Sequence, residues 1–176
     1  MQSAVQWAFN AEGPRPKRTL KITYDRKEEE LVAVLTVDGE SQTITLNADS
    51  GGWDDHNALP QGKWYIVKNP RGDDNYFALF RDDGNINHQF SDGGKWRDGI
   101  KLGFHNITGS HGCVMGTPWG GWSGYDFSAK SDWGTLQGWI RSSPTETFRY
   151  QNNEIPNRSD PNWYTGTSYG TLNVIN

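Results

Sequence analysis

The residues best suited to covalent chemistry lie in one short segment, residues 103–116 (GFHNITGSHGCVMG). It contains the only cysteine of the chain, Cys113, and two of its four histidines, His105 and His111. A free thiol with a pKa of about 8.5 is mostly protonated at neutral pH, whereas the thiolate is the nucleophile. An imidazole within hydrogen-bond reach can take the thiol proton and later return it to a leaving amine. The segment therefore predicts a cysteine nucleophile activated by a histidine.

Spacing alone leaves both histidines open as the base. His105 ends a predicted strand and Cys113 follows a glycine-rich turn, so the chain can fold back and bring the two together. His111 is two residues before Cys113, and residues two apart share a face wherever the chain is extended. Gly112 between them can break that alternation. The spacing is compatible with either histidine as the base.

The residues just before Cys113 have their own expected roles. A glycine at position 112 lets the backbone approach a substrate closely and adopt angles closed to other residues. The backbone amides of Gly112 and Cys113 are candidates for an oxyanion hole that stabilises a tetrahedral intermediate. Ser110 is expected to shape the turn through hydrogen bonds.

Two simpler interpretations apply to the same residues. Free cysteine is among the most buried residue types and is often an inert core side chain. A metal site built from His105, His111 and Cys113 would offer three ligands, one fewer than a structural zinc site uses. The other histidines, His56 and His88, lie in polar, loop-like contexts and are expected to be exposed. No metal or cofactor is predicted.

Aromatic and basic side chains near the segment are secondary candidates for substrate binding. Trp119 and Trp122 follow the nucleophile directly, and exposed aromatics there can stack on glycan or line a groove. They can equally cap the core. Arg97 can bind a substrate carboxylate through two parallel hydrogen bonds.

These residues must be positioned by a chain whose pattern is mainly that of β-strands. Leu20, Ile22 and Tyr24 alternate with polar residues, which is the period of a half-buried strand. The dipeptide Asp38-Gly39 is a hairpin signal. Strands are expected at residues 19–24, 31–37, 41–47, 63–68, 76–81, 100–105, 147–150 and 170–175, with a loop from 49 to 62.

One helix is predicted between these strands. Residues 131–142 carry Trp133, Leu136, Trp139 and Ile140 at helical spacing, and Ser131 is the expected N-cap. The pattern predicts one domain, residues 19–176, that is mainly β with one or two short helices. Residues 1–18, which end in a Pro- and Arg-rich stretch, form an N-terminal lead-in.

Composition supports a folded β domain and excludes other classes. The chain has 176 residues with nine Trp, seven Tyr and seven Phe, whereas disordered chains are poor in aromatic residues. Twenty-one Gly and eight Pro indicate many turns. A net charge of −4 argues against a nucleic-acid partner. The single cysteine excludes an intrachain disulfide and any zinc site that needs several cysteines.

No membrane or secretory signal is recognisable in the sequence. The apolar runs are far shorter than the roughly eighteen residues that span a bilayer, so no membrane span is expected. The first residues, MQSAVQWAFNAEGPRPKR, lack a basic head followed by an apolar core. We therefore expect synthesis in the cytoplasm without a signal peptide.

The tetrad Ser110-His111-Gly112-Cys113 with an upstream histidine resembles the active-site signature of the L,D-transpeptidases, the cysteine enzymes of bacterial peptidoglycan. Residues 57–67 (NALPQGKWYIV) are similar to the segment with a proline, a glycine and an aromatic strand that precedes the core of these domains. Residues 169–174 (YGTLNV) are similar to their closing strand. The resemblance covers about residues 19–117 and the C-terminal strand.

The resemblance implies a fold, a reaction and residue roles. The expected fold is an L,D-transpeptidase-like β-sandwich or barrel. Cys113 would be the nucleophile and His105 the base, attacking the third residue of a peptidoglycan stem peptide and forming a thioester acyl-enzyme. The acceptor can be water, a D-amino acid or a stem amine. A backbone carbonyl near Asn106 would orient His105.

Two departures from the housekeeping enzymes indicate a branch of the family. The gap from His105 to Cys113 is eight residues, shorter than is usual there, and Met115 stands where Asn or Arg is often found. The short gap and the missing signal peptide resemble the compact L,D-transpeptidase-like toxins of type VI secretion systems. That branch implies delivery to a target cell's periplasm, with a secretion-system component and an immunity protein as partners.

Two other functions fit parts of the sequence. A non-enzymatic, Trp-rich glycan-binding module would account for the aromatic and glycine content. A different Cys–His peptidoglycan amidase or peptidase would use the same residue pair on another bond.

Overall fold

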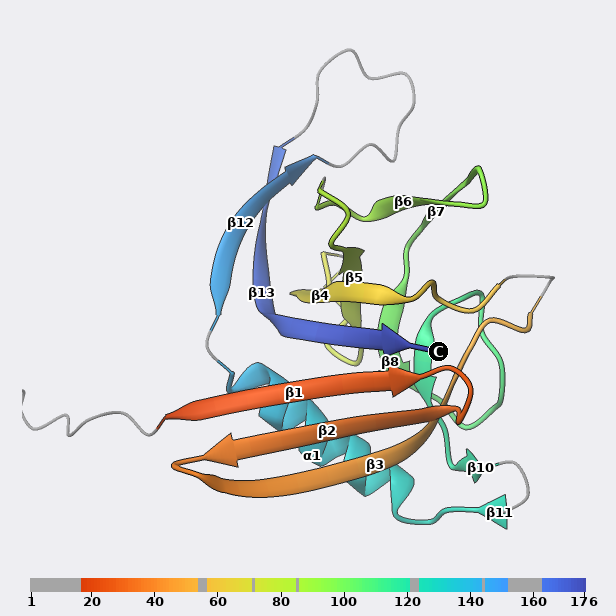
Figure 1. Ribbon diagram of the computed structural model, residues 1–176, viewed down its shortest axis with the longest axis vertical. Helices are drawn as coiled ribbons and strands as arrows, with labels where there is room; N and C mark the ends of the chain where they lie inside the picture. The colour runs from red at the N-terminus through yellow and green to blue at the C-terminus, as the bar shows by residue number, and fades with distance from the viewer. Residues whose placement is uncertain are drawn as a thin grey trace, which may run out of the picture.

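The alternating pattern of the N-terminal part produces a three-stranded antiparallel meander (Figure 1). The computed structural model describes residues 17–53, 57–70, 72–84, 86–120, 124–143, 145–151 and 163–176. At the turn between the second and third strands Asp38 has φ +50° and Gly39 has φ +94°. Two successive positive φ angles are typical of the two-residue hairpin turn that the Asp-Gly signal predicts. The strands of this part are β1 (Arg18–Asp25), β2 (Glu30–Val37) and β3 (Glu40–Ser50).

Ten further strands and one helix follow β3 along the described part of the chain. They are β4 (Gly62–Lys68), β5 (Phe77–Arg81), β6 (Gln89–Asp92), β7 (Lys95–Asp98), β8 (Lys101–Phe104), β9 (Val114–Gly116), β10 (Trp119–Gly120), β11 (Gly124–Tyr125), α1 (Ala129–Arg141), β12 (Glu146–Gln151) and β13 (Trp163–Ile175).

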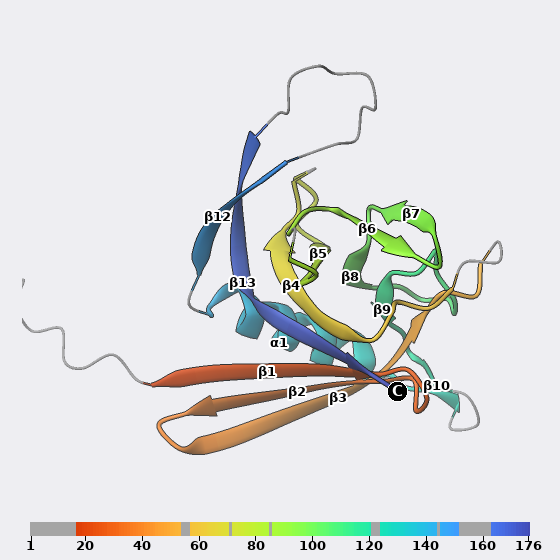
Figure 2. The same ribbon diagram turned by 45° about the horizontal axis from the view of Figure 1, so that its top comes forward.

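The main sheet closes on itself into a barrel. Its strand order is β1-β2-β3-β9-β8-β5-β4-β13-β12, and β1 also pairs with β13 in parallel. All of these strands except β12 therefore form a continuous ring, in which each strand has a partner on both sides. β13 supplies two edges by bending near Gly170, where its register with β4 shifts. Figure 2 shows β12 and the first half of β13 rising away from the ring.

The core fills the ring and continues beneath α1. Leu31, Trp64, Leu102, Val114 and Leu172 are fully buried, and they come from five different strands of the barrel. Burying each such side chain contributes about 1.5–3 kcal/mol. The packing of these side chains fixes β8 and β9, the two strands that flank the cysteine segment.

The predicted helix is present and starts earlier than expected. It spans Ala129–Arg141, and Ser128, not Ser131, occupies the N-cap position. Trp133, Leu136 and Ile140 are buried, as their spacing predicts. The helix packs mainly against β3, as its position across the β1–β3 part of the sheet in Figure 1 indicates.

The mainly β fold class with one helix is thus confirmed, although individual strands differ from the expectation. The β6–β7 hairpin and the three-residue β9 were not predicted. The expected 49–62 loop begins later, because β3 continues through Ser50. Arg18, expected in the N-terminal lead-in, already belongs to β1.

Candidate active site

The turn before Cys113 is organised by the hydroxyl of Ser110. This hydroxyl donates to the carbonyl of Cys113 at 2.7 Å. It also accepts the backbone N–H groups of Gly51 at 3.0 Å and Gly112 at 3.1 Å. Ser110 is 4% exposed, so all three bonds are shielded from water. Ser110 thus makes hydrogen bonds within the turn and from the turn to Gly51.

Gly112 occupies a conformation that only glycine adopts easily. Its φ is +97°, in the region where a Cβ is strained. Its N–H is bound to Ser110, and its carbonyl accepts the hydroxyl of Ser50 at 3.1 Å. The Gly112 amide, a predicted oxyanion-hole donor, is therefore already hydrogen-bonded to Ser110 within the turn.

Cys113 lies immediately before β9, level with the start of β8. The two strands are parallel, with Leu102 opposite Val114, so Cys113 stands beside Lys101. Burial raises the pKa of the Cys113 thiol above its ordinary value. The backbone N–H of Lys101 and the positive charges of Lys101 and Arg97 act in the opposite direction. The thiol is therefore partly buried and shifted toward its protonated form, and the charges of Lys101 and Arg97 offset only part of this effect.

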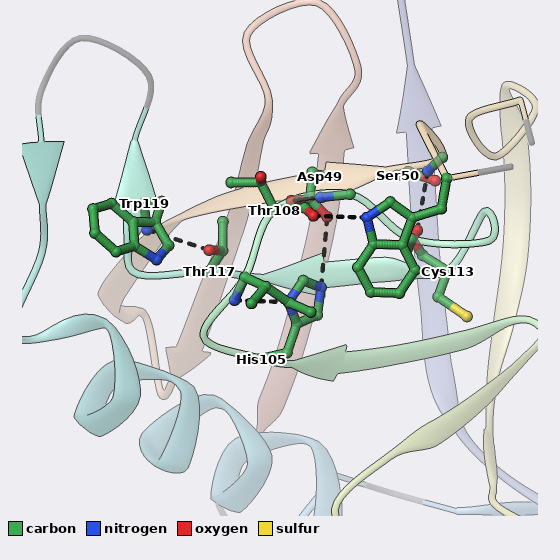
Figure 3. Close-up of polar contacts among 12 residues, drawn as sticks. Asp49, Ser50, His105, Thr108, Cys113, Thr117 and Trp119 are labelled. Carbon is green, nitrogen blue, oxygen red and sulfur yellow. Dashed lines mark hydrogen bonds and ion pairs between the residues drawn. The ribbon is translucent and has the colours of Figure 1, made fainter. Parts of the chain in front are cut away.

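His105 faces a carboxylate that the sequence pattern did not reveal. Its Nε2 lies 3.8 Å from Oδ1 of Asp49, and its Nδ1 accepts the backbone N–H of Ile107 at 3.2 Å. The other carboxylate oxygen of Asp49 accepts the N–H of Gly109 at 2.7 Å. Figure 3 shows the His105 ring directed toward Asp49. Nε2 and Oδ1 are both buried and have no hydrogen-bond partner.

Burial shifts the pKa values of these two groups in opposite directions. It lowers the pKa of His105, and the negative charge of Asp49 partly offsets this effect. It raises the pKa of Asp49, against the hydrogen bond from Gly109 and the charge of His105. Each group is thus pushed toward its neutral form, while its neighbour favours the charged form.

The structure does not bring the predicted nucleophile and base into contact. His105 follows β8, level with the end of β9, whereas Cys113 precedes β9. This offset of four residues corresponds to about 13 Å along a strand. In Figure 3 the Cys113 thiol points away from the His105 ring, and neither residue is hydrogen-bonded to the other.

The carbonyl of Asn106 does not orient His105 as the resemblance implied. It accepts the indole N–H of Trp119 at 2.9 Å instead. Trp119 is 47% exposed, and its ring contacts Tyr125 at a centroid distance of 5.0 Å. Trp122 lies outside the described residues.

The other two described histidines have different surroundings. His111 is exposed, and its ring makes a T-shaped contact with Trp53 at a centroid distance of 5.4 Å. His88, expected to be exposed, is buried with 8% exposure and packs against Phe80, so this expectation is wrong. The loop context of His88 gave no sign of this core packing. His56 lies outside the described residues.

Arg97 is bound to protein groups rather than open to a substrate. Its Nη1 donates to Asp92 at 2.7 Å and to the carbonyl of Ala58 at 3.3 Å, and its Nη2 donates to the carbonyl of Asn57 at 2.9 Å. A cleft of about 470 Å³ adjoins these partners and is lined by Arg26, Asn57, Ala58, Pro60, Gln61, Arg81 and Asp92. Arg81, which the sequence also makes a candidate for binding a substrate carboxylate, and Arg26, which the sequence pattern did not single out, therefore place cationic groups at this cleft.

Metal and membrane features are not found in the part of the chain that the structure describes. Its histidine, cysteine and carboxylate side chains form no group of three or more that could hold a metal ion. None of the described helices is long and apolar enough to cross a membrane.

Comparisons with known proteins give no match for this chain among protein-family models, curated proteins or solved structures.

Proposed function

We propose that this protein is a cysteine-dependent enzyme acting on peptidoglycan stem peptides, with Cys113 as the nucleophile. The observation that carries the proposal is the glycine-containing turn, fixed by Ser110, that presents Cys113 beside the charges of Lys101 and Arg97. The Ser-His-Gly-Cys tetrad and the mainly β fold support it further.

The proposed reaction has two steps. The Cys113 sulfur attacks the carbonyl carbon of the third stem residue, the peptide bond to the terminal D-alanine breaks, and the thiol proton passes to the leaving amine. A thioester remains on the enzyme. Water then releases a tripeptide stem, or an amine forms a new amide bond, and the thiol regains a proton from the acceptor.

The proposed base is His105. For this role the 105–113 segment must change conformation, because His105 and Cys113 are not in contact. Both of its ring nitrogens are directed to protein groups, Asp49 and Ile107, so substrate binding would have to close the 105–113 segment before proton transfer. His111 is the alternative base in the same segment. Removing a general base typically costs about 100-fold or more in rate. We expect this loss for His105→Gln and only a small loss for His111→Gln; the reverse result would reassign the base.

Digestion of purified sacculi followed by mass spectrometry tests the function. We expect the wild-type protein to convert tetrapeptide stems into tripeptide or exchanged stems, and Cys113→Ala to leave them intact. Cleavage between glycan and peptide would instead support a Cys–His amidase. Processing that survives Cys113→Ala would refute the cysteine mechanism.

We also propose that the protein is an antibacterial effector delivered to the periplasm, with an immunity protein and a secretion-system component as partners. Expression with an added periplasmic signal should lyse or arrest the host, and Cys113→Ala should abolish this effect. Unchanged growth in the presence of correctly exported wild-type protein would contradict the proposal.

A glycan-binding role without catalysis is the second candidate. The exposed rings of Trp119, Tyr125 and Phe127 form a contiguous set, with centroid distances of 5.0 and 4.8 Å. Exposed apolar patches of this kind often mark interaction sites. Binding of Cys113→Ala to sacculi, together with no stem processing by the wild type, would favour this candidate.

A further inference from the structure

Arg97 joins the Cys113 turn to a loop far away in the sequence. The guanidinium reaches the carbonyls of Asn57 and Ala58 in the segment before β4 and the carboxylate of Asp92 on β6. Its side chain is only 11% exposed, and its bonds to Ala58 and Asp92 are partly buried. Charged hydrogen bonds of this kind are stronger than neutral ones.

The same guanidinium lies directly over Gly112. A Cβ added to Gly112 would fall 1.8 Å from Nη2 of Arg97 and 3.2 Å from the carbonyl oxygen of Asn57. Only a residue without a side chain leaves room for this approach. Two constraints therefore favour glycine before Cys113: the backbone has a positive φ, and the guanidinium of Arg97 occupies the space that a side chain would fill.

We propose that Arg97 is a positioning residue for Cys113: it clamps the 110–113 turn against the 57–60 loop and keeps a positive charge beside the thiol. The inference rests on the proposed role of Cys113 as the nucleophile. It assigns Arg97 a place in the protein framework of the site, in contrast to the substrate-carboxylate role predicted from the sequence.

Two positive charges act on the thiol in this arrangement. Lys101 faces it from β8 and Arg97 from β7, and both favour the thiolate. Asp92 is paired with Arg97 and partly neutralises it. His111 belongs to the same turn as the cysteine. Removing the charge of Arg97 should therefore raise the pKa of Cys113, and removing that of Asp92 should lower it.

The pH dependence of Cys113 alkylation by iodoacetamide, measured on the full chain, tests the proposal. A rise of about half a pKa unit corresponds to about threefold less thiolate at a pH below both values. We expect at least this shift for Arg97→Met. Arg97→Lys should restore part of it, because lysine keeps the charge but cannot reproduce the planar fork. Lys95→Met, an exposed residue on the same strand, is the control for loss of charge alone.

Asp92→Asn tests the same electrostatic effect if Arg97→Met does not fold. It leaves Arg97 in place and should move the alkylation profile to lower pH. Profiles of Arg97→Met that coincide with those of Lys95→Met, or an Asp92→Asn profile that is unchanged or moved to higher pH, would overturn the proposal. The readout needs no peptidoglycan, so a failure of the proposed function leaves this result interpretable.

Discussion

At the residue scale, the unexpected feature is the buried pair of Asp49 and His105. Their facing atoms, Oδ1 and Nε2, are 3.8 Å apart, too far for a hydrogen bond, and neither has another partner. Because Nδ1 accepts the N–H of Ile107, the proton of a neutral ring is placed on Nε2, facing the carboxylate. A small movement of the two side chains toward each other would form a charge-assisted hydrogen bond from Nε2–H of His105 to Oδ1 of Asp49 and fix the orientation of the ring.

Replacing Asp49 with Asn should lower the pKa of His105 further. The carboxylate charge is the main influence that opposes the burial effect on the ring, and the substitution removes that charge while keeping the shape of the side chain. NMR titration of the histidine ring protons measures the shift. Glu40→Gln, at the exposed start of β3, is the matched control and should leave the titration unchanged. An unaltered titration in Asp49→Asn would show that the pair is not electrostatically coupled.

His105 should also make the stability of the protein depend on pH. Its pKa is lower in the folded protein than in the unfolded chain, so the unfolded chain binds a proton that the folded protein does not. The free energy of unfolding should therefore fall as the pH drops below the ordinary histidine pKa of about 6.5.

Chemical denaturation between about pH 7.5 and about pH 5.5 checks this prediction. His105→Gln should lose less stability over this range than the wild type, whereas His111→Gln, at an exposed site, should follow the wild-type curve. The pKa of Asp49 is raised in the folded protein, so its ionisation should lower the free energy of unfolding as the pH rises above its ordinary pKa of about 3.9. Parallel curves for wild type and His105→Gln would contradict the prediction.

At the element scale, one hydroxyl connects the cysteine turn to the end of β3. Ser110 bonds the backbone of Gly51, Gly112 and Cys113, and Ser50 adds two further bonds, accepting the N–H of Leu59 and donating to Gly112. The turn is thus held by β3 and by the loop that follows it. This explains how a three-residue strand, β9, can hold a defined position at the site.

Ser110→Ala should therefore destabilise the protein. It leaves the buried N–H groups of Gly51 and Gly112 without an acceptor, and each such group costs about 1–3 kcal/mol. Ser91→Ala, at an exposed site on β6, should change the free energy of unfolding by less than about 0.5 kcal/mol. Urea denaturation of both variants is the measurement, and equal effects would rule out a central role for the Ser110 hydroxyl.

At the scale of the whole molecule, the barrel depends on its last strand. β13 pairs with β4 on one edge and with β1 on the other, so the C-terminal residues close a ring that begins at Arg18. Leu172, fully buried, lies where both pairings meet. The stability of the site's framework is therefore linked to the C-terminal residues.

Leu172→Ala should cost about 2–5 kcal/mol, as expected for a buried leucine in a packed core. Asn173→Ala changes the adjacent, exposed side chain of the same strand and should cost less than about 0.5 kcal/mol. Thermal and urea unfolding provide the comparison. A Leu172→Ala protein as stable as Asn173→Ala would contradict the importance of this closure.

The sequence predicted those features that leave a local pattern. Alternation gave the strands near Ile22 and Ile44, and helical spacing gave the buried face of α1. β9 was missed because three residues are too few to show a period. Asp49 was missed because it meets His105 only through the packing of β3, β9 and β8, a contact between distant segments.

Trapping the acyl-enzyme is a direct test of Cys113 as the nucleophile. Intact-protein mass spectrometry after mixing with a tetrapeptide stem should show an added mass equal to the stem without its terminal D-alanine. Peptide mapping should place this mass on Cys113, and Cys113→Ala should show none. Stems processed with no adduct at Cys113, or processed by Cys113→Ala as well as by the wild-type protein, would show that Cys113 is not the nucleophile.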